Sequence, residues 1–372
     1  DERRSEIVAS QLDLNHEDLI PEEDRVVTIS NGGYAKSQPL DTYQAQRRGG
    51  MGKSATSVKD EDFVEHLLVV NTHTTILCFS NIGKVYWLRA YQIPVAGRNS
   101  RGRPMVNLLP LDANERITSI LPVNEYTEGY FIFMATGFGT VKKTPLEAFS
   151  RQRSVGLRAI ELDEGDVLIG TAITNGENDI LLLTSAGKAA RFPETAVRAM
   201  GRTARGVRGI RMDEDQRAIA MIIPQEGGRV LTVSENGYGK RTLVEDFPAK
   251  GRGNRGVIAM AMSERNGPLV GAVQVFEGDD LMLISDQGTL VRTRTDEVSI
   301  LSRNTQGVRV IRLKEDEHLV GVQRVEEEDE KLLQVDEDAD TDTATTDDVI
   351  AGEAASTDGD DAAAPADDSG EE

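Results

Sequence analysis

A pair of glycines recurs six times along the chain at intervals of about 50 residues, and this repeat restricts the possible folds. The first glycine of each pair ends a short turn that begins with Ser or Thr, as in Ser234-Glu235-Asn236-Gly237. The first glycines are Gly33, Gly83, Gly139, Gly187, Gly237 and Gly288, and the second, 17 or 19 residues later, are Gly52, Gly102, Gly156, Gly206, Gly256 and Gly307. Six copies in one register indicate an array of six similar structural units.

Each unit contains four short apolar runs of the kind that form β-strands. In the fourth unit these runs are 179–184, 188–192, 206–212 and 217–223, bounded by Gly, Asp or Pro. A period of about 50 residues with four strands per unit is typical of a propeller-like disc, in which each blade packs against its neighbours. We therefore predict an all-β fold, a six-bladed disc of four-stranded blades over residues 25–325.

Acidic residues are concentrated at the two ends of the chain. The net charge is −21, yet residues 1–24 hold nine acids against two bases and residues 326–372 hold 20 acids against one base. Residues 25–325 are therefore net positive by five charges. Residues 326–372 have few large apolar side chains, so we predict a disordered acidic tail there. Residues 1–24 are predicted to be a connector from an upstream domain.

Composition argues against several classes of protein. No run of about 18 apolar residues and no secretory signal is found, so we expect a cytoplasmic protein that does not cross a membrane. Cys78 is the only cysteine, and His16, His66, His73 and His318 are scattered, so we expect no disulfide and no metal site.

Each unit carries a cationic loop close to its second glycine. The first loop, Gln46-Arg47-Arg48-Gly49-Gly50-Met51-Gly52-Lys53, combines three cations with three glycines. Glycine lets a backbone approach a ligand closely, and guanidinium groups match phosphate oxygens. The cations of the other loops are Arg98, Arg101, Arg103, Arg151, Arg153, Arg202, Arg205, Lys250, Arg252, Arg255 and Arg303. A solvated surface would not repeat in phase, so we predict that these loops bind the phosphates of duplex DNA with little sequence preference.

Acidic residues recur at the next turn of each unit. They include Asp112, Asp163, Asp213, Glu264 and Glu315. Because successive hairpin turns lie at opposite strand ends, we expect the acids and the cationic loops to lie on opposite faces of the disc. We interpret these acids as turn formers and predict no catalytic residue.

The first cationic loop resembles a family motif. The run Gln46-Arg47-Arg48-Gly49-Gly50-Met51-Gly52 is similar to the basic box of the C-terminal domain of the bacterial DNA gyrase A subunit, Gln-Arg-Arg-Gly-Gly-Lys-Gly. The run 25–36, the six repeats and the acidic tail extend the resemblance over essentially the whole chain. Met51 departs from the motif, because the family has Lys there, and Lys53 is a candidate substitute.

The resemblance implies a six-bladed β-pinwheel, a propeller variant with strands exchanged between adjacent blades, that wraps DNA around its rim with positive handedness. It implies that wrapping enables negative supercoiling by a holoenzyme containing the N-terminal cleavage domain of the gyrase A subunit together with the gyrase B subunit. It also implies that ATP and Mg bind to other domains of the holoenzyme, so we expect this domain to have no cofactor and no catalytic activity. We expect the isolated domain to be a monomer.

Two alternatives remain from the sequence. One is the C-terminal domain of the topoisomerase IV A subunit, which resembles this chain in its repeats but lacks an intact basic box. The other is a propeller that serves as a protein-interaction platform and binds acidic partners through its loops. Duplex binding with a steep salt dependence would favour DNA over an acidic protein.

Overall fold

The computed structural model describes residues 16–40, 64–97, 100–287 and 290–326. The predicted tail from residue 327 onward, the start of the predicted connector and the first cationic loop lie outside these residues. Within the described part, the strands run from Asp24 to Val325. No helix in that part is long and apolar enough to span a membrane.

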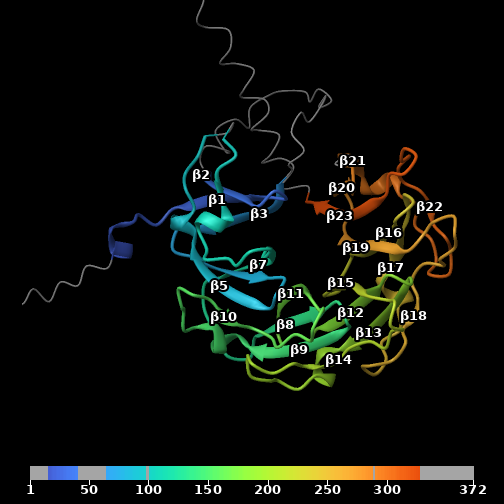
Figure 1. Ribbon diagram of the computed structural model, residues 1–372, viewed down its shortest axis with the longest axis horizontal. Helices are drawn as coiled ribbons and strands as arrows, with labels where there is room; N and C mark the ends of the chain where they lie inside the picture. Colours follow the sequence, from blue (N-terminus) through green and yellow to red (C-terminus); the bar gives the residue numbers. More distant parts are fainter. Residues whose placement is uncertain (1–15, 41–63, 98–99, 288–289, 327–372) are drawn as a thin grey trace, which may run out of the picture.

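The described strands form six antiparallel sheets arranged as blades around a ring (Figure 1). Each blade has an inner, a second and a third strand. The inner strands are β3 (Val64–Asn71), β7 (Ile117–Val123), β11 (Leu168–Thr174), β15 (Ala218–Ile222), β19 (Leu269–Val275) and β23 (Leu319–Val325). The second strands are β1 (Asp24–Ser30), β4 (Thr75–Ser80), β8 (Phe131–Thr136), β12 (Asp179–Thr184), β16 (Arg229–Ser234) and β20 (Asp280–Ser285). The third strands are β2 (Tyr34–Pro39), β5 (Lys84–Arg89), β9 (Thr140–Pro145), β13 (Lys188–Pro193), β17 (Tyr238–Leu243) and β21 (Leu290–Arg294).

A fourth, outer strand joins each of the first five blades and comes from the following repeat. The outer strands are β6 (Arg103–Pro104), β10 (Leu157–Arg158), β14 (Val207–Arg208), β18 (Val257–Ile258) and β22 (Val308–Arg309). In blade 4, for example, the order is β15-β12-β13-β18, although β18 follows the third strand of blade 5 in the chain. The exchange of strands between adjacent blades is thus present, and the all-β six-bladed prediction is confirmed.

The outer strands are shorter than the sequence indicated. The run 206–212 was expected to be one strand, but only Val207 and Arg208 pair, with Val141 and Thr140 of blade 3. The next two amides, of Gly209 and Ile210, both donate to the carbonyl of Gly139, at 2.8 and 3.3 Å, which turns the chain away from the sheet edge.

The Ser or Thr at the start of each repeated turn has a structural role. In blade 4, the amide of Gly187 donates to the carbonyl of Thr184 at 3.0 Å, and the Thr184 hydroxyl accepts from the amide of Lys188 at 3.2 Å. Gly187 has a φ of +70°, which other residues rarely adopt. A β-bulge lies beside this turn, where the register shifts between Leu183 and Thr184, and blades 1, 2, 3, 5 and 6 have a bulge at the same place. The Ser or Thr and the glycine that this turn requires recur in each blade, and they make the repeat visible in the sequence.

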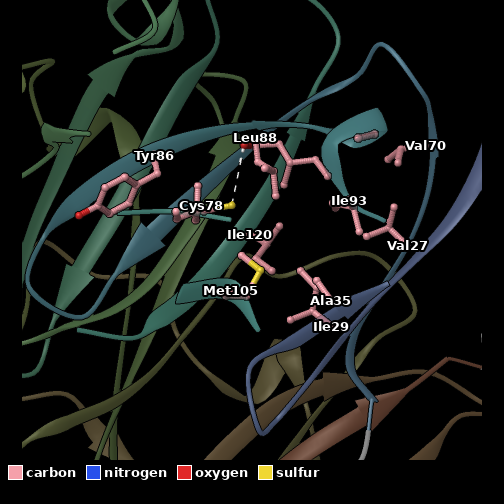
Figure 2. Packing of buried hydrophobic residues seen from close by; sticks show 13 residues of the cluster. Val27, Ile29, Ala35, Val70, Cys78, Tyr86, Leu88, Ile93, Met105 and Ile120 are labelled. Carbon is pink, nitrogen blue, oxygen red and sulfur yellow. Dashed lines mark hydrogen bonds between the residues drawn. The ribbon is translucent and has the colours of Figure 1, made fainter. Parts of the chain in front are cut away.

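The hydrophobic core is divided into clusters between successive blades. Alternate side chains of a second strand point to the two neighbouring blades, so Cys78 packs toward blade 1 while Leu77 and Phe79 pack toward blade 3. This explains why the central positions of the second strands include consecutive apolar residues, as in Ile180–Leu183 of β12. Figure 2 shows the cluster between blades 1 and 2, which includes Val27, Ile29, Ala35, Val70, Cys78, Leu88, Ile93, Met105 and Ile120.

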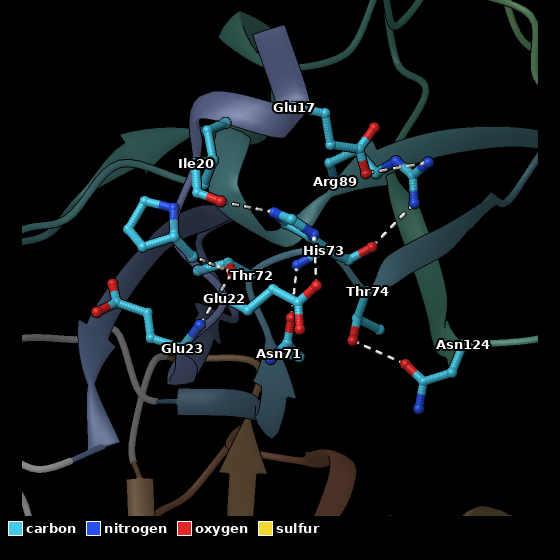
Figure 3. A network of polar contacts seen from close by, with 11 residues as sticks. Glu17, Ile20, Glu22, Glu23, Asn71, Thr72, His73, Thr74, Arg89 and Asn124 are labelled. Carbon is cyan, nitrogen blue, oxygen red and sulfur yellow. Dashed lines mark hydrogen bonds and ion pairs between the residues drawn. The ribbon is translucent and has the colours of Figure 1, made fainter. Parts of the chain in front are cut away.

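Short 3₁₀ helices follow the third strands of blades 2 to 6, and two more precede β1 and β7. They are η1 (His16–Leu19), η2 (Ala90–Gln92), η3 (Met105–Asn107), η4 (Leu146–Phe149), η5 (Glu194–Ala196), η6 (Val244–Asp246) and η7 (Thr295–Glu297). The segment that contains η1 lies against blades 1 and 2 through polar contacts (Figure 3). Nε2 of His73 lies 3.0 Å from the carbonyl of Ile20, and Arg89 lies 3.4 Å from a carboxylate oxygen of Glu17. The chain thus enters the ring at the strand ends opposite the glycine turns.

Candidate nucleic-acid interface

The cationic loops in the described part of the chain lie on the outer edges of the blades. After its third strand and 3₁₀ helix, each of blades 2 to 6 sends the chain to the preceding blade, where the outer strand then pairs. Parallel backbone bridges occur on this path between Val95 and Ser37, Ala199 and Lys143, Ala249 and Arg191, and Ile300 and Arg241. Each loop therefore occupies the rim of the blade before its own, and the loops recur around the periphery of the ring (Figure 1).

The described candidate residues are distributed over the rims of five blades. Blade 1 carries Arg101 and Arg103, blade 2 Arg151 and Arg153, blade 3 Arg202 and Arg205, blade 4 Arg252 and Arg255, and blade 5 Arg303. Arg202 and Arg303 are half-buried and the other seven are exposed. Gln46, Arg47, Arg48, Gly49, Gly50, Gly52, Lys53 and Arg98 lie outside the described residues. The structure thus spreads the described candidates along one edge of the ring instead of gathering them into a pocket.

Two of these arginines also connect neighbouring loops. Arg252 donates to the carbonyl of Arg208 at 2.9 Å and to that of Ala196 at 3.1 Å. Arg303 donates to the carbonyl of Ile258 at 2.9 Å. A guanidinium group has five N–H donors, so each side chain retains donors for a phosphate while it links adjacent blades.

The expected separation of acids from cations is wrong for two loops. Arg205 forms an ion pair with Asp163 at 3.0 Å, and Arg255 forms one with Asp213 at 3.2 Å. The reason is the exchanged outer strand, which carries the second half of each cationic loop back to the strand end where the acidic turns lie. All four side chains are more than a third exposed, so these pairs contribute little to stability.

Three further arginines on the rim were missed in the sequence. Arg158, Arg208 and Arg309 occupy the second position of their outer strands and are exposed. Each lies two residues after the second glycine of its repeat, and that spacing was a signal that could have identified them. The outer strands therefore add a second row of cations beside the loops.

The comparisons with known proteins agree with this geometry. The sequence profile of the DNA gyrase C-terminal domain, a β-propeller, matches residues 24–71, 74–124, 130–175, 178–225, 228–275 and 279–326, one segment for each blade. The chain belongs to this family. The DNA gyrase A subunit of Salmonella typhimurium is 58% identical over 338 residues, which cover 90% of this chain and 38% of that protein. The chain thus corresponds to a minor part of the length of a gyrase A subunit.

Two solved structures resemble this gyrase domain. The C-terminal domain of a DNA topoisomerase IV has a TM-score of 0.74 at 25% identity and covers 88% of this chain and 99% of its own. A DNA gyrase A C-terminal domain has a TM-score of 0.62 at 27% identity and covers 82% of this chain and 100% of its own. The shape is thus common to both kinds of topoisomerase, whereas the family profile and the 58% identity identify a gyrase A domain.

Two buried lysines support the cationic loops of this gyrase domain from beneath. Nζ of Lys142, on β9, donates to the carbonyl of Ala159 at 2.6 Å and to that of Arg202. Nζ of Lys240, at the same position on β17, donates to the carbonyl of Arg303 at 2.5 Å. Burial, aided by the neighbouring arginine, lowers the pKa of Lys142 to about 7 and that of Lys240 to about 8. The loop backbones are thus held by amines that lose their protons near neutral pH.

Replacing Lys142 and Lys240 by Met is expected to remove a pH dependence of stability. The ordinary lysine pKa is 10.5, so above about pH 7 the unfolded chain binds more protons than the folded chain, and the free energy of unfolding rises with pH. Below pH 7 both states are protonated and these lysines add no pH dependence. Each contributes at most about 1.4 kcal/mol per pH unit.

Urea unfolding midpoints of parent and variant, measured from about pH 6.5 to about pH 8.5, test this expectation. The range stops there because burial raises the pKa of Cys78 to about 12 from 9.0, and that group lowers stability as its unfolded form ionises. An equal rise of the midpoint in parent and variant would contradict the assignment.

Proposed function

We propose that this domain binds duplex DNA along the rim of its disc and wraps it with positive handedness. The observation that supports this most directly is the recurrence of exposed arginines at equivalent rim positions of successive blades. Few aromatic side chains accompany them, which suits contacts to phosphates better than the reading of base edges. Binding is therefore tolerant of sequence.

The size of such a disc matches the helical repeat of DNA. Four strands spaced by about 4.8 Å around a narrow channel give a radius of roughly 22 Å, so a duplex on the rim has its axis at about 33 Å from the centre. One sixth of that circumference is roughly 35 Å, about one turn of B-DNA, and successive blades then meet the same face of the duplex. Bending by about 60° per turn costs several kcal/mol per 20–30 base pairs, which cations on successive blades offset.

In the holoenzyme, the wrap presents a DNA segment for ATP-dependent strand passage and so enables negative supercoiling. DNA cleavage belongs to the N-terminal domain of the gyrase A subunit, and ATP hydrolysis with its Mg belongs to other domains, including the gyrase B subunit. This domain supplies neither catalytic residues nor a cofactor, and it acts in the cytoplasm on the nucleoid. The 38% share of a gyrase A subunit that the chain covers supports this division of roles.

A topology assay tests the proposal. Circular DNA is relaxed by a topoisomerase in the presence of the chain, and the sign of the trapped writhe is read after the protein is removed. We expect positive writhe and duplex binding with a slope of log affinity against log salt of roughly −9, as for about ten neutralised phosphates. A slope near −2, or no trapped writhe, would refute the proposal.

Substituting Asn for Asp163 and Asp213 is expected to tighten duplex binding. Both carboxylates hold rim arginines in exposed ion pairs, each worth up to about 1 kcal/mol, so their removal frees Arg205 and Arg255 for phosphates. We expect a gain of a few-fold, up to about tenfold, in affinity at low salt.

The matched control for this variant replaces Glu164 by Gln and Asp215 by Asn. Both control residues are exposed and lie in the same turns, so net charge changes equally without release of an arginine. Binding curves at several salt concentrations compare the two variants. An equal gain in both would show that net charge alone sets the affinity.

A further inference from the structure

A cationic recess lies at the start of β17, beside the outer strand of blade 5. It has a volume of about 520 Å³ and is lined by Tyr238, Arg265, Arg309, Val310, Ile311 and Arg312. None of the lining residues is acidic. Within the described part of the chain, no carboxylate forms an ion pair with any of its three arginines. The recess therefore carries an unbalanced positive charge.

Two of the guanidinium groups flank the ring of Tyr238. Cζ of Arg265 lies 4.5 Å and Cζ of Arg309 5.4 Å from the ring centroid. Nη2 of Arg309 also donates to the Tyr238 hydroxyl at 2.8 Å. Hydrogen bonds from Arg265 and Arg309 lower the pKa of Tyr238, as expected for a phenol beside two guanidinium groups.

Strand pairing and two asparagine side chains hold the backbone of the recess in place. Arg309 lies opposite Tyr238 in the pairing of β22 with β17. The loop that carries Arg265 is fixed by Nδ2 of Asn236, which donates to the Arg265 carbonyl at 3.1 Å. The fully buried Asn266 braces the same loop by accepting from the amide of Ser263 at 2.7 Å. Arg265 and Arg309 are thus positioned against Tyr238 before any ligand binds, which reduces the entropy cost of binding.

Blade 3 has a corresponding recess that differs in charge. Arg208 lies opposite Thr140 there, as Arg309 lies opposite Tyr238, and Arg211 corresponds to Arg312. The lining of this second recess includes the acids Asp213 and Glu214. Two blades thus share a pair of arginines, but only the recess of blade 5 combines them with a tyrosine hydroxyl and no acid in its lining.

We propose that Tyr238, Arg265, Arg309 and Arg312 form a phosphate-binding pocket that takes a phosphodiester group of the duplex and fastens it at blade 5. The planar donors of arginine match phosphate oxygens, and the tyrosine hydroxyl adds one more donor. This inference rests on the proposed function and deepens it, because it makes one point of the rim a specific phosphate site while the other rim contacts remain diffuse.

Paired substitutions in the two recesses test the proposal. Arg309→Gln with Arg312→Gln removes two charges from blade 5, and Arg208→Gln with Arg211→Gln removes two from blade 3. If the pocket binds phosphate through charge-assisted hydrogen bonds, the blade 5 variant loses at least about tenfold more affinity for duplex than the blade 3 variant. Equal losses would overturn the proposal.

The second readout is the NMR resonance of the Tyr238 ring. Binding of duplex would leave this resonance unchanged if the arginines only stabilised the fold. Tyrosine labelled with ¹³C at Cζ is incorporated, and the Tyr238 resonance is identified by its loss in Tyr238→Phe. Added duplex is expected to shift this resonance and to raise the pKa of Tyr238, because a bound phosphate neutralises the arginines. Inorganic phosphate is titrated in parallel.

The outcomes separate the two proposals. A parent that binds duplex and traps writhe, without a shift of the Tyr238 resonance, would refute the pocket and leave the proposed function standing. A shift with inorganic phosphate but not with duplex would also refute it, since the pocket would then serve a free anion. A parent that does not bind duplex would refute the proposed function and the pocket's role in it together.

Discussion

Alanine at position 256 is expected to destabilise the domain by about 3 kcal/mol or more. Gly256 has a φ of +73°, and a side chain in that conformation costs about 1–2 kcal/mol. A Cβ there would also lie 2.6 Å from the carbonyl oxygen of Ala189 and 2.9 Å from its carbonyl carbon. Because these are backbone atoms of β13, the clash is relieved only if β18 moves off the edge of blade 4. Urea unfolding of the variant measures the loss.

The same loop contains its own control. Gly251 has open space where a Cβ would be added and no positive φ, so Gly251→Ala is expected to change stability by no more than about 0.5 kcal/mol. Blade 3 offers a second matched pair in Gly206, where a Cβ would lie 2.5 Å from the carbonyl oxygen of Val141, and Gly201, where it would meet nothing. Similar stabilities for the members of each pair would show that the crossing between blades tolerates a side chain.

Gly256 shows why the number of blades could be predicted from the sequence and the exchange of strands could not. Gly256 recurs as the second glycine because the chain passes so close to the neighbouring blade that no side chain fits. Because the equivalent glycines that the structure describes are under the same constraint, glycine recurs about every 50 residues in the sequence, and six blades could be predicted from that repeat. The exchange itself left no such trace, because an outer strand such as Val257–Ile258 is two residues long and cannot show the alternation of a β-strand.

The candidate interface was predictable in its cations but not in their partners. Arg205 and Asp163 lie 42 residues apart in the sequence, and they meet because β14 joins blade 3 from the next repeat. Lys142 looks like a surface cation in the sequence, yet its amine is buried under the loop of Arg202. In both cases, contacts between different repeats determine the environment of the charged group. The spacing of the repeats in the sequence does not show which repeats contact each other.

Replacing residues 46–53 by a loop of Ala, Gly and Ser is expected to abolish wrapping while it weakens binding only modestly. In this segment the adjacent arginines Arg47 and Arg48 are followed by three glycines within four residues, an arrangement that none of the other five cationic loops has. Loss of three charges releases about three fewer counterions, so the salt slope falls by about 2.7. Wrapping depends on fastening the ends of a bent duplex, and a duplex with one free end straightens under several kcal/mol of elastic energy. The topology assay should therefore show no trapped positive writhe, and the holoenzyme should relax DNA without supercoiling it.

The control for the loop replacement removes the same charge from other blades. Arg151, Arg153 and Arg202 lie on the rims of blades 2 and 3. None of them forms an ion pair in the described part of the chain, so substitution by Gln breaks no ion pair of the folded domain. Because they support the middle of the curve, this variant should lose as much affinity as the loop variant and still trap positive writhe. If the loop variant traps as much writhe as the parent, residues 46–53 are one phosphate contact among many. If both variants lose writhe equally, total rim charge and not position governs the wrap.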